Sequence, residues 1–402
     1  MSTVIVQKYG GSSVADPVRL KAVAQRIADT CAQGHKVVAV VSAMGDTTDE
    51  LLALAGKITD RPPRRELDML LTTGERITTS LLAMALAELG IEAISFTGSQ
   101  CGILTNDTHS GARIVEVRPY RVEDELARGR VVIVAGYQGV SYRREVTTLG
   151  RGGTDTTAVA LAAALGAEYC EICSDVDGVY SADPRVVPDA QRLEQLSCEE
   201  TQVLAEAGAK VLHAAAVEYA RRHRIAIWAR KTATPASSVG DGTMVRVDPP
   251  TAPPTITGVA AREALRLSTP GGAQALGRLA AWLSGEGLDA KWLQWPGGEA
   301  PVVAYLFSED VHGAQGVRER FLAAFGSEAR FEAGVSVVSA VGSAVDADPS
   351  VTQAFLEEAG AAGAALGAFE RTSLRLSVVV PAAAVAELLR RLHGRLVEGE
   401  RL

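Results

Sequence analysis

The chain has 402 residues, of which 47% are hydrophobic and 22% charged, and its formal net charge is −8. This length exceeds one ordinary domain, and the composition is that of a globular protein of two or three domains. The negative charge argues against a nucleic-acid or anionic-membrane surface, and neither a signal peptide nor an apolar run of membrane-spanning length is recognisable, so we expect a cytoplasmic protein that acts on small molecules.

The first predicted element is an apolar strand that runs into two glycines and two hydroxyls. The strand covers Val4–Lys8, and Tyr9, Gly10, Gly11, Ser12 and Ser13 follow it. Adjacent glycines let successive N–H groups point into one concavity, and Lys8 adds a positive charge, so this loop suits the phosphates of a nucleotide. The spacing matches neither the dinucleotide fingerprint nor the P-loop. Taken alone, the same residues are also compatible with an ordinary turn.

Residues 1 to about 247 alternate short apolar runs with helical segments, which is typical of α/β architecture. Most of the strands are continuous apolar runs, as in a parallel sheet covered on both faces. They are expected at Val4–Lys8, Lys36–Val41, Ala93–Phe96, Val131–Ala135, Tyr169–Ile172 and Ala226–Ala229. Helices are expected at Pro17–Ala32 and Thr156–Leu165.

Polar loops follow several of these strands directly. They are Gly10–Ser13, Ser42–Thr48, Thr97–Ser99 and Ser174–Gly178. Because the carboxyl ends of parallel strands lie at one edge of a sheet, these loops are expected to surround one ligand-binding crevice.

A second glycine pair precedes the second predicted helix, in the segment Gly150-Arg151-Gly152-Gly153-Thr154-Asp155. Thr154 or Asp155 is suited to cap the helix, and a helix N-terminus attracts anions. Capping does not explain Arg151, whose planar guanidinium suits a carboxylate or a phosphate. The segment therefore favours an anion-binding loop.

The five cysteines are scattered and odd in number, as is typical of reduced thiols. Cys170 and Cys173 form a C-x-x-C pair within a predicted strand, where residues three apart face opposite sides. Buried small side chains are therefore favoured over a metal pair, and no metal ligand is assigned.

Residues 247–254 contain four prolines and are expected to form a stiff connector. We therefore predict one domain at residues 1–247, a linker at 248–258 and a C-terminal region at 259–402. In that region strand and helix signals repeat as in two βαββαβ modules. The expected segments are Ala264–Leu267, Gly272–Ser284, Val302–Leu306, Ala314–Phe325, Val335–Val341, Val351–Ala359, Leu374–Val380 and Ala382–Leu392.

Seven segments in order resemble the aspartate kinases of the amino-acid kinase superfamily, most closely the actinobacterial type. They are Lys8–Ser13, Val41–Leu51, Thr73–Arg76, Phe96–Gln100, Gly150–Asp155, Ser174–Arg185 and Gly208–His213. The resemblance implies a three-layer αβα sandwich with a mostly parallel sheet, followed by two ferredoxin-like ACT modules that pair subunits into a homodimer or higher homo-oligomer. It also implies an enzyme of amino-acid biosynthesis, serving lysine and threonine or a specialised product. This enzyme uses ATP and Mg²⁺ to phosphorylate the side-chain carboxylate of L-aspartate.

The resemblance also implies roles for individual residues. Lys8 and Asp155 are catalytic, Asp155 by orienting the phosphate-binding lysine. Aspartate is held by Thr48, Glu75, Arg151, Gly152, Gly153 and Thr154. The nucleotide is held by Lys8, Tyr9, Gly10, Gly11, Ser42, Ser174, Asp175, Tyr180, Arg185 and Lys210. Without the resemblance, Glu75 in the helix-like stretch Leu70–Ile77 would be read as solvent-facing, Arg185 as part of a turn and His213 as structural.

The chain departs from the family pattern at two places. Thr154 stands where the family normally has serine, which adds a methyl group beside the substrate. In the C-terminal modules, the expected Asp-x-Pro-Gly loop reads Ser268-Thr269-Pro270-Gly271, without its acid. Gln294 persists among the effector-binding positions, whereas the Ser-Thr-Ser-Glu segment reads Glu370-Arg371-Thr372-Ser373 and the second Pro-Gly loop reads Asp348-Pro349-Ser350. We therefore expect weak or absent feedback inhibition by lysine and threonine.

Two alternatives stay open on the sequence. One is an amino-acid kinase of the same fold that acts on a different acceptor. The other is a non-catalytic regulatory subunit, which would be expected to have lost Lys8, Asp155 or Lys210, whereas all three are present.

Overall fold

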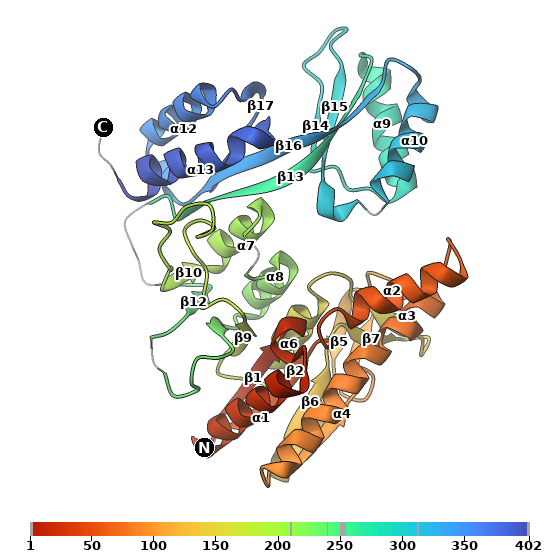
Figure 1. Ribbon diagram of the computed structural model, residues 1–402, viewed down its shortest axis with the longest axis vertical. Helices are drawn as coiled ribbons and strands as arrows, with labels where there is room; N and C mark the ends of the chain where they lie inside the picture. The colour runs from red at the N-terminus through yellow and green to blue at the C-terminus, as the bar shows by residue number, and fades with distance from the viewer. Residues whose placement is uncertain (1–2, 210, 239, 250–254, 312, 400–402) are drawn as a thin grey trace. The chain divides into compact units, whose positions relative to one another are not determined.

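The computed structural model describes residues 3–209, 211–238, 240–249, 255–311 and 313–399 (Figure 1). The chain forms two compact units. The N-terminal unit comprises Met1–Tyr180, Arg192–Glu206 and Lys210–Thr251, and the C-terminal unit comprises Ser181–Gln191, Ala207–Ala209 and Ala252–Leu402. Residues 181–191 lie inside the expected 1–247 domain but belong to the C-terminal unit. Residues 250–254 of the expected linker lie outside the described residues.

The N-terminal unit is built on an eight-stranded sheet in the order β10-β12-β11-β9-β1-β2-β6-β3. Its neighbouring strands pair in parallel except β11 and β12. The strands are β1 (Val4–Tyr9), β2 (Lys36–Val41), β3 (Ala93–Phe96), β6 (Val131–Ala135), β9 (Cys170–Ser174), β10 (Gln195–Ser197), β11 (Ile227–Lys231) and β12 (Thr243–Arg246). The six strands expected in this region are all present. Their continuous apolar runs reflect burial on both faces, and Val37–Val41 at the centre are at most 1% exposed.

Helices cover both faces of this sheet. The helices of the unit are α1 (Pro17–Ala32), α2 (Thr47–Ile58), α3 (Arg64–Leu71), α4 (Thr73–Glu88), α5 (Tyr120–Ala127), α6 (Gly153–Ala164), α7 (Cys198–Ala207) and α8 (Ala214–His223), with a short 3₁₀ turn η1 (Gly11–Val14). Tyr9 packs in a cluster with α1 and α4, whereas the preceding residue, Lys8, pairs with Asp155 of α6. Because successive strand residues point to opposite faces, α6 lies on the face opposite α1 and α4, which gives three layers.

The helix-like stretch Leu70–Ile77 is helical except at Thr72, because α3 ends at Leu71 and α4 begins at Thr73. One local expectation in this unit is wrong. Helix α6 begins at Gly153 with Gly152 as its N-cap residue, so Thr154 and Asp155 lie in the first turn and do not cap it. The reason is Gly152, whose left-handed conformation, with φ of +71°, lets the helix begin at the next residue, before Thr154 and Asp155.

A small second sheet, in the order β5-β4-β7-β8, was not anticipated. Its strands are β4 (Ile103–Thr105), β5 (Ile114–Val117), β7 (Gln138–Ser141) and β8 (Val146–Thr148). Strands this short carry too little periodicity to be recognised from sequence. The sheet matters because β8 leads directly into the second glycine loop.

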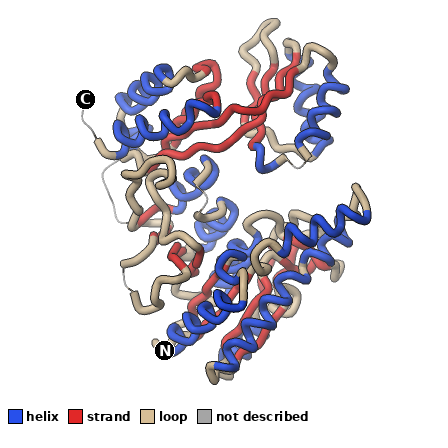
Figure 2. The backbone as a smooth tube through the Cα atoms, viewed as in Figure 1, coloured by secondary structure: helices blue, strands red, loops and turns tan. Residues whose placement is uncertain are grey.

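The C-terminal unit is one antiparallel sheet in the order β14-β15-β13-β16-β18-β17, with helices packed on it (Figure 2). The strands are β13 (Gly258–Thr269), β14 (Trp292–Gln294), β15 (Val302–Phe307), β16 (Arg330–Val341), β17 (Ala365–Arg371) and β18 (Arg375–Pro381). The helices are α9 (Ala273–Glu286), α10 (Ala314–Phe325), α11 (Ala344–Ala347), α12 (Pro349–Ala361) and α13 (Val385–Leu392), with 3₁₀ turns η2 (Ser308–Asp310) and η3 (Ala382–Ala384) and the π-helical turn η4 (His393–Val397).

The two modules of this unit share their central strands. Strands β13 and β16 are each 12 residues long, and their register shifts between Ala264 and Arg266. On one side of the shift these strands pack with α9 and α10, and on the other with α12 and α13. The expected pair of modules is therefore present, with the first inserted into the second.

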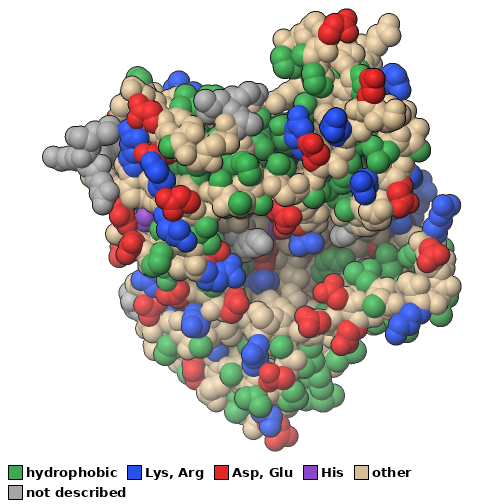
Figure 3. Space-filling view, turned by 45° about the horizontal axis from the view of Figure 1, so that its top comes forward, with side chains coloured by type: hydrophobic (Ala, Val, Ile, Leu, Met, Phe, Trp, Pro, Cys, Tyr) green, Lys and Arg blue, Asp and Glu red, His purple; other side chains and the backbone are tan. Residues whose placement is uncertain are grey.

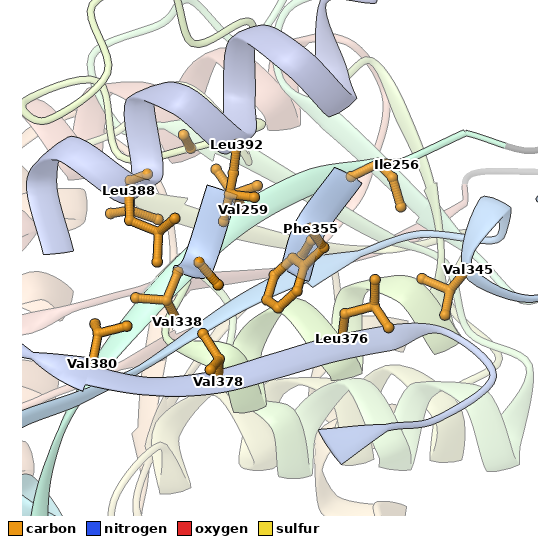
Figure 4. Packing of buried hydrophobic residues seen from close by; sticks show 14 of the residues in the cluster. Ile256, Val259, Val338, Val345, Phe355, Leu376, Val378, Val380, Leu388 and Leu392 are labelled. Atoms are coloured by element: carbon orange, nitrogen blue, oxygen red, sulfur yellow. The ribbon is translucent and has the colours of Figure 1, made fainter. Parts of the chain in front are cut away.

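Apolar side chains from α12 and α13 fill the core of the second module. Phe355 of α12 lies among Val259, Leu376 and Val378, and Leu388 of α13 belongs to the same buried cluster (Figure 4). Ala182 and Val187 from the 181–191 segment complete this cluster. That segment is thus part of the hydrophobic core of the C-terminal unit.

On the face drawn in Figure 3, acidic and basic side chains are interspersed. Within the described residues no helix is long and apolar enough to cross a membrane. Cys170 and Cys173 are fully buried free thiols, and burial raises the pKa of both.

Candidate active site

The first glycine loop lies directly against the loop after β2. A Cβ atom on Gly11 would lie 3.0 Å from the carbonyl oxygen of Ala43, and the N–H of Gly45 donates to the carbonyl of Gly11 at 3.1 Å. A Cβ atom on Gly10 would lie 3.2 Å from Nζ of Lys8. The glycines therefore allow two backbones and one ammonium group to approach more closely than other residues would permit.

The second glycine loop is joined to the first by an ion pair. Nζ of Lys8 lies 2.7 Å from Oδ1 of Asp155, and both side chains are largely buried, at 13% and 12% exposed. Asp155 lies in the first turn of α6, where the helix dipole also favours a negative charge. The pair fixes the ammonium group at the carboxyl end of β1.

A hydroxyl pair makes a second link between the loops. Oγ of Ser42, directly after β2, donates to Oγ1 of Thr154 at 3.0 Å. The additional methyl of Thr154 faces Gly136, where a Cβ atom would lie 2.5 Å from Cγ2 of the threonine. Gly136 was not singled out from the sequence, although its place directly after β6, at the same sheet edge, was an available signal.

Glu75 is a buried acidic residue of the site. It is 2% exposed, and its Oε1 accepts a hydrogen bond from the N–H of Ala43 at 3.2 Å. Its Oε2 is buried without a hydrogen-bond partner among the described residues. Burial raises the pKa of Glu75 to about 7, although the backbone hydrogen bonds oppose the shift. A buried carboxylate oxygen without a partner is costly, and a cationic ligand group would satisfy it.

Arg151 belongs to the second glycine loop, and Thr48 follows the loop after β2. Arg151 is exposed, and among the described residues it has no ion-pair partner. Thr48 is half-buried in the first turn of α2. The site thus combines an available guanidinium group with an unsatisfied buried carboxylate.

The loop after β9 shares the sheet edge with the first glycine loop because β9 and β1 are neighbours. Within it, the hydroxyl of Tyr180 donates to Asp177 at 2.9 Å, and Asp175 is exposed. Thr232, which the sequence did not indicate, connects the two loops. Its Oγ1 lies 2.7 Å from Oγ of Ser13, and its N–H donates to the carbonyl of Ser174 at 2.8 Å.

Several expected residues are not brought to this site by the described contacts. Arg185 belongs to the C-terminal unit and pairs with Asp183 at 2.7 Å. Lys210 lies outside the described residues. The side chain of Tyr9 is fully buried in the core, where its hydroxyl donates to Gln7, so only its main chain is available to a ligand.

The expected effector residues lie far apart within one chain. Gln294 is on β14, at one edge of the six-stranded sheet. Thr372 and Ser373 are exposed in the turn between β17 and β18, at the other edge. These residues form no common site within a single C-terminal unit.

Two further residues, Asp68 and His213, position the second glycine loop. Asp68 on α3 is fully buried and accepts hydrogen bonds from Oγ1 of Thr148 and Nδ1 of His109, both at 2.7 Å. It thereby fixes the end of β8, two residues before the second glycine loop. The ring of His213 packs on Gly152, where a Cβ atom would lie 2.1 Å from Cγ of the histidine.

Comparison with known proteins agrees with this architecture. Residues 3–229 match the model of the amino acid kinase family. An aspartokinase of Mycobacterium tuberculosis is 56% identical over 263 residues, which cover 64% of this chain but only 61% of that relative. An aspartokinase of Thermus thermophilus is 38% identical over 400 residues, which cover 97% of this chain and 98% of the relative.

The fold is also similar to that of E. coli aspartokinase III, whose crystal structure contains aspartate and ADP. The TM-score is 0.81 at 24% identity, over 98% of this chain and 99% of the other. Both the family match and the full-length relative lead to one conclusion: the chain belongs to the amino acid kinase family, as a member of its aspartokinase group.

Proposed function

We propose that this chain transfers the γ-phosphoryl group of ATP to the side-chain carboxylate of L-aspartate, which gives 4-phospho-L-aspartate and ADP. The observation that carries the proposal is the joining of two glycine loops by the Lys8–Asp155 ion pair, together with the buried and unsatisfied Oε2 of Glu75. The similarity to aspartokinases from two bacteria supports the choice of acceptor.

The reaction needs no general base. The attacking carboxylate is ionised at neutral pH, because such groups titrate near pKa ~4. The difficulty is repulsion between this anion and the triphosphate, together with charge that spreads over the phosphoryl oxygens in the transition state. Lys8 supplies the positive charge, the N–H groups of Gly10 and Gly11 add donors, and Asp155 holds the ammonium group in position. Ser42 lies beside the transferred phosphoryl group.

Magnesium fits this site as an ion carried by the nucleotide. The described residues contain no group of three or more His, Cys, Asp or Glu side chains that could hold a metal ion. Mg²⁺ commonly binds through substrate phosphates and water, so no protein ligand is assigned. When bound, it neutralises negative charge on the phosphates.

Recognition of aspartate requires a group of opposite charge at each end of the amino acid. Glu75 receives the α-ammonium group on Oε2, and Arg151 receives the α-carboxylate. Thr48 and Thr154 offer hydroxyls, and the loop at Gly152 and Gly153 brings its main chain close to the substrate. The methyl of Thr154 faces Gly136, and this placement supports aspartate over an altered acceptor.

The nucleotide is held by the loop that follows β9. Tyr180 offers a ring face to adenine, and Ser174 and Asp175 offer polar contacts to the ribose. Arg185 and Lys210 contribute phosphate charge, a role that rests on the family resemblance.

The direct test is ATP turnover with trapping of the acyl phosphate. Purified chain, MgATP and L-aspartate should release ADP and, with hydroxylamine present, form aspartyl hydroxamate in equal amount. L-glutamate and N-acetyl-L-glutamate serve as matched acceptors. Faster turnover of either one would contradict the assignment of aspartate, and absence of turnover with all three would favour a non-catalytic subunit.

We further propose that feedback inhibition by lysine and threonine is weak or absent, while the C-terminal modules pair two chains. The supporting observation is the loop Ser268–Gly271, which lacks an acid for an amino acid's ammonium group. A Cβ atom on Gly271 would lie 2.3 Å from the carbonyl oxygen of Ala300, so the loop is also closely packed. Inhibition assays with lysine, threonine and both together test the first point, and light scattering tests the second. Strong concerted inhibition would contradict weak feedback.

A further inference from the structure

The segment that follows Tyr180, residues 181–191, is part of the hydrophobic core of the C-terminal unit. Tyr180 is the last residue of the first N-terminal stretch, and Ser181–Gln191 belong to the C-terminal unit. Ala182 and Val187 are buried in the same cluster as Leu388 of α13. The conformation of this segment therefore depends on side chains near the C-terminus of the chain.

Ser181 is held by hydrogen bonds from both its main chain and its side chain. Its carbonyl oxygen accepts from the N–H of Val259 at 2.7 Å, and its N–H donates to the carbonyl of Gln191 at 2.9 Å. Its hydroxyl oxygen accepts from the N–H of Gln191 at 2.9 Å and lies 2.8 Å from Nε2 of His393. Ser181 and His393 are each 1% exposed, so water cannot replace these contacts without opening the core.

The protons of this pair are determined by its neighbours. The Ser181 hydroxyl oxygen already accepts from Gln191, so its own proton is available to Nε2 of His393. Nδ1 of His393 then carries the ring proton and faces Oε1 of Glu398 at 3.3 Å. Burial lowers the pKa of His393, against the charges of Glu398 and Asp189, which agrees with a neutral ring.

His393 begins the π-helical turn η4, directly after α13. Such turns are rare and often occur at functional sites. The neighbouring helix also contacts the segment, because Nε of Arg390 donates to the carbonyl of Val186 at 3.1 Å. The C-terminal helix thus holds both the beginning and the middle of the segment.

We propose that His393 is a positioning residue for ATP. By holding Ser181, it fixes the peptide bond that follows Tyr180 and the start of the Asp183–Arg185 turn. The second module of the C-terminal unit thereby determines the conformation of residues 181–191. This inference rests on the proposed nucleotide role of Tyr180 and Arg185. In this proposal α13 and η4 connect the sheet of the C-terminal unit to the segment after Tyr180, and this connection influences the KM for ATP.

The test compares His393→Leu with His393→Gln in the full-length chain. Leucine fills the volume without a polar atom, whereas the amide oxygen of glutamine can accept the Ser181 proton. We expect His393→Leu to raise the KM for ATP about fivefold, the effect of one lost hydrogen bond, with little change in kcat or in the KM for aspartate. His393→Gln should restore a near-normal KM. Ser181→Ala should raise the KM similarly and add little to His393→Leu in the double variant.

Ser377→Ala is the matched control, because its hydroxyl lies 2.8 Å from that of Ser339 in a buried pair of the six-stranded sheet. It should lower the thermal unfolding temperature without changing the KM for ATP. An unchanged KM in His393→Leu, with a similar loss of stability, would overturn the role of His393. Tyr180→Ala separates the two proposals: if it leaves the KM for ATP unchanged, the nucleotide role of the segment fails and the inference fails with it.

Discussion

Glu75→Gln tests the recognition of the substrate's ammonium group. Glutamine keeps the size of the side chain and the acceptor for the Ala43 N–H but removes the negative charge. A hydrogen bond to a charged group contributes about 1.5–3 kcal/mol, so the KM for aspartate should rise about 10- to 100-fold, with the KM for ATP nearly unchanged.

The raised pKa of Glu75 gives this prediction a pH dependence. With a pKa of about 7, the carboxylate is mostly protonated at pH 6 and mostly ionised at pH 8. Because only the ionised form attracts an ammonium group, the KM for aspartate should be about tenfold higher at pH 6 than at pH 8. The ratio of the wild-type to the Glu75→Gln value isolates this effect, since titration of ATP and aspartate is common to both proteins.

Stability should depend on pH in the opposite sense. The pKa of Glu75 rises from 4.5 to about 7 in the folded protein, so its stabilising contribution is complete below pH 4.5 and is lost as the pH rises to about 7. The shift corresponds to roughly 3 kcal/mol. At pH 8, without aspartate, Glu75→Gln should therefore unfold at higher denaturant concentration than the wild type.

The measurements are steady-state hydroxamate assays between pH 6 and 8.5 and urea unfolding at pH 5 and 8. Glu66→Gln is the control, because Glu66 is exposed on the adjacent helix and, within the described part of the chain, pairs only with Arg65. It should change neither the KM for aspartate nor the urea concentration at which the protein unfolds. The reasoning is refuted if Glu75→Gln leaves the KM for aspartate within twofold of the wild type, or if it raises the KM for ATP instead.

Four further substitutions test the joined loops. Lys8→Met should lower kcat about 100- to 1000-fold at saturating substrates, because one charged donor to the transferred phosphoryl group is lost; a kcat within threefold of wild type would exclude this role. Gly136→Ala should raise the KM for aspartate, because overpacking costs about 1–3 kcal/mol. Thr154→Ser should be nearly neutral alone and should recover part of this loss in the double variant, because it removes Cγ2. If Gly136→Ala has the same effect with Thr154 and with Ser at position 154, the methyl does not pack on Gly136. Thr232→Val should raise the KM for ATP about three- to tenfold, since two hydrogen bonds between the first glycine loop and the loop after β9 are lost, whereas a change confined to the KM for aspartate would contradict this connection.

The parallel sheet could be predicted from the sequence because its strands are buried on both faces. Val37–Val41 and Val131–Ala135 are continuous apolar runs, and the observed strands end where those runs end. The same logic placed the polar loops at one edge, and the hydrogen bond from the N–H of Gly45 to the carbonyl of Gly11 confirms that two of these loops meet. The short strands of the second sheet gave no comparable signal.

Long-range contacts determined the features of the fold and the site that local sequence patterns did not indicate. The sequence by itself determined which residues are candidates for the chemistry, because glycine pairs, charges and strand ends are local patterns. Only the tertiary structure decided that Glu75 is buried with an unsatisfied oxygen, that the methyl of Thr154 packs on Gly136 and that Ser181 is held by His393. Each of these contacts joins residues that are distant in sequence, and the desolvation or close packing they produce depends on the folded chain, which no local pattern encodes.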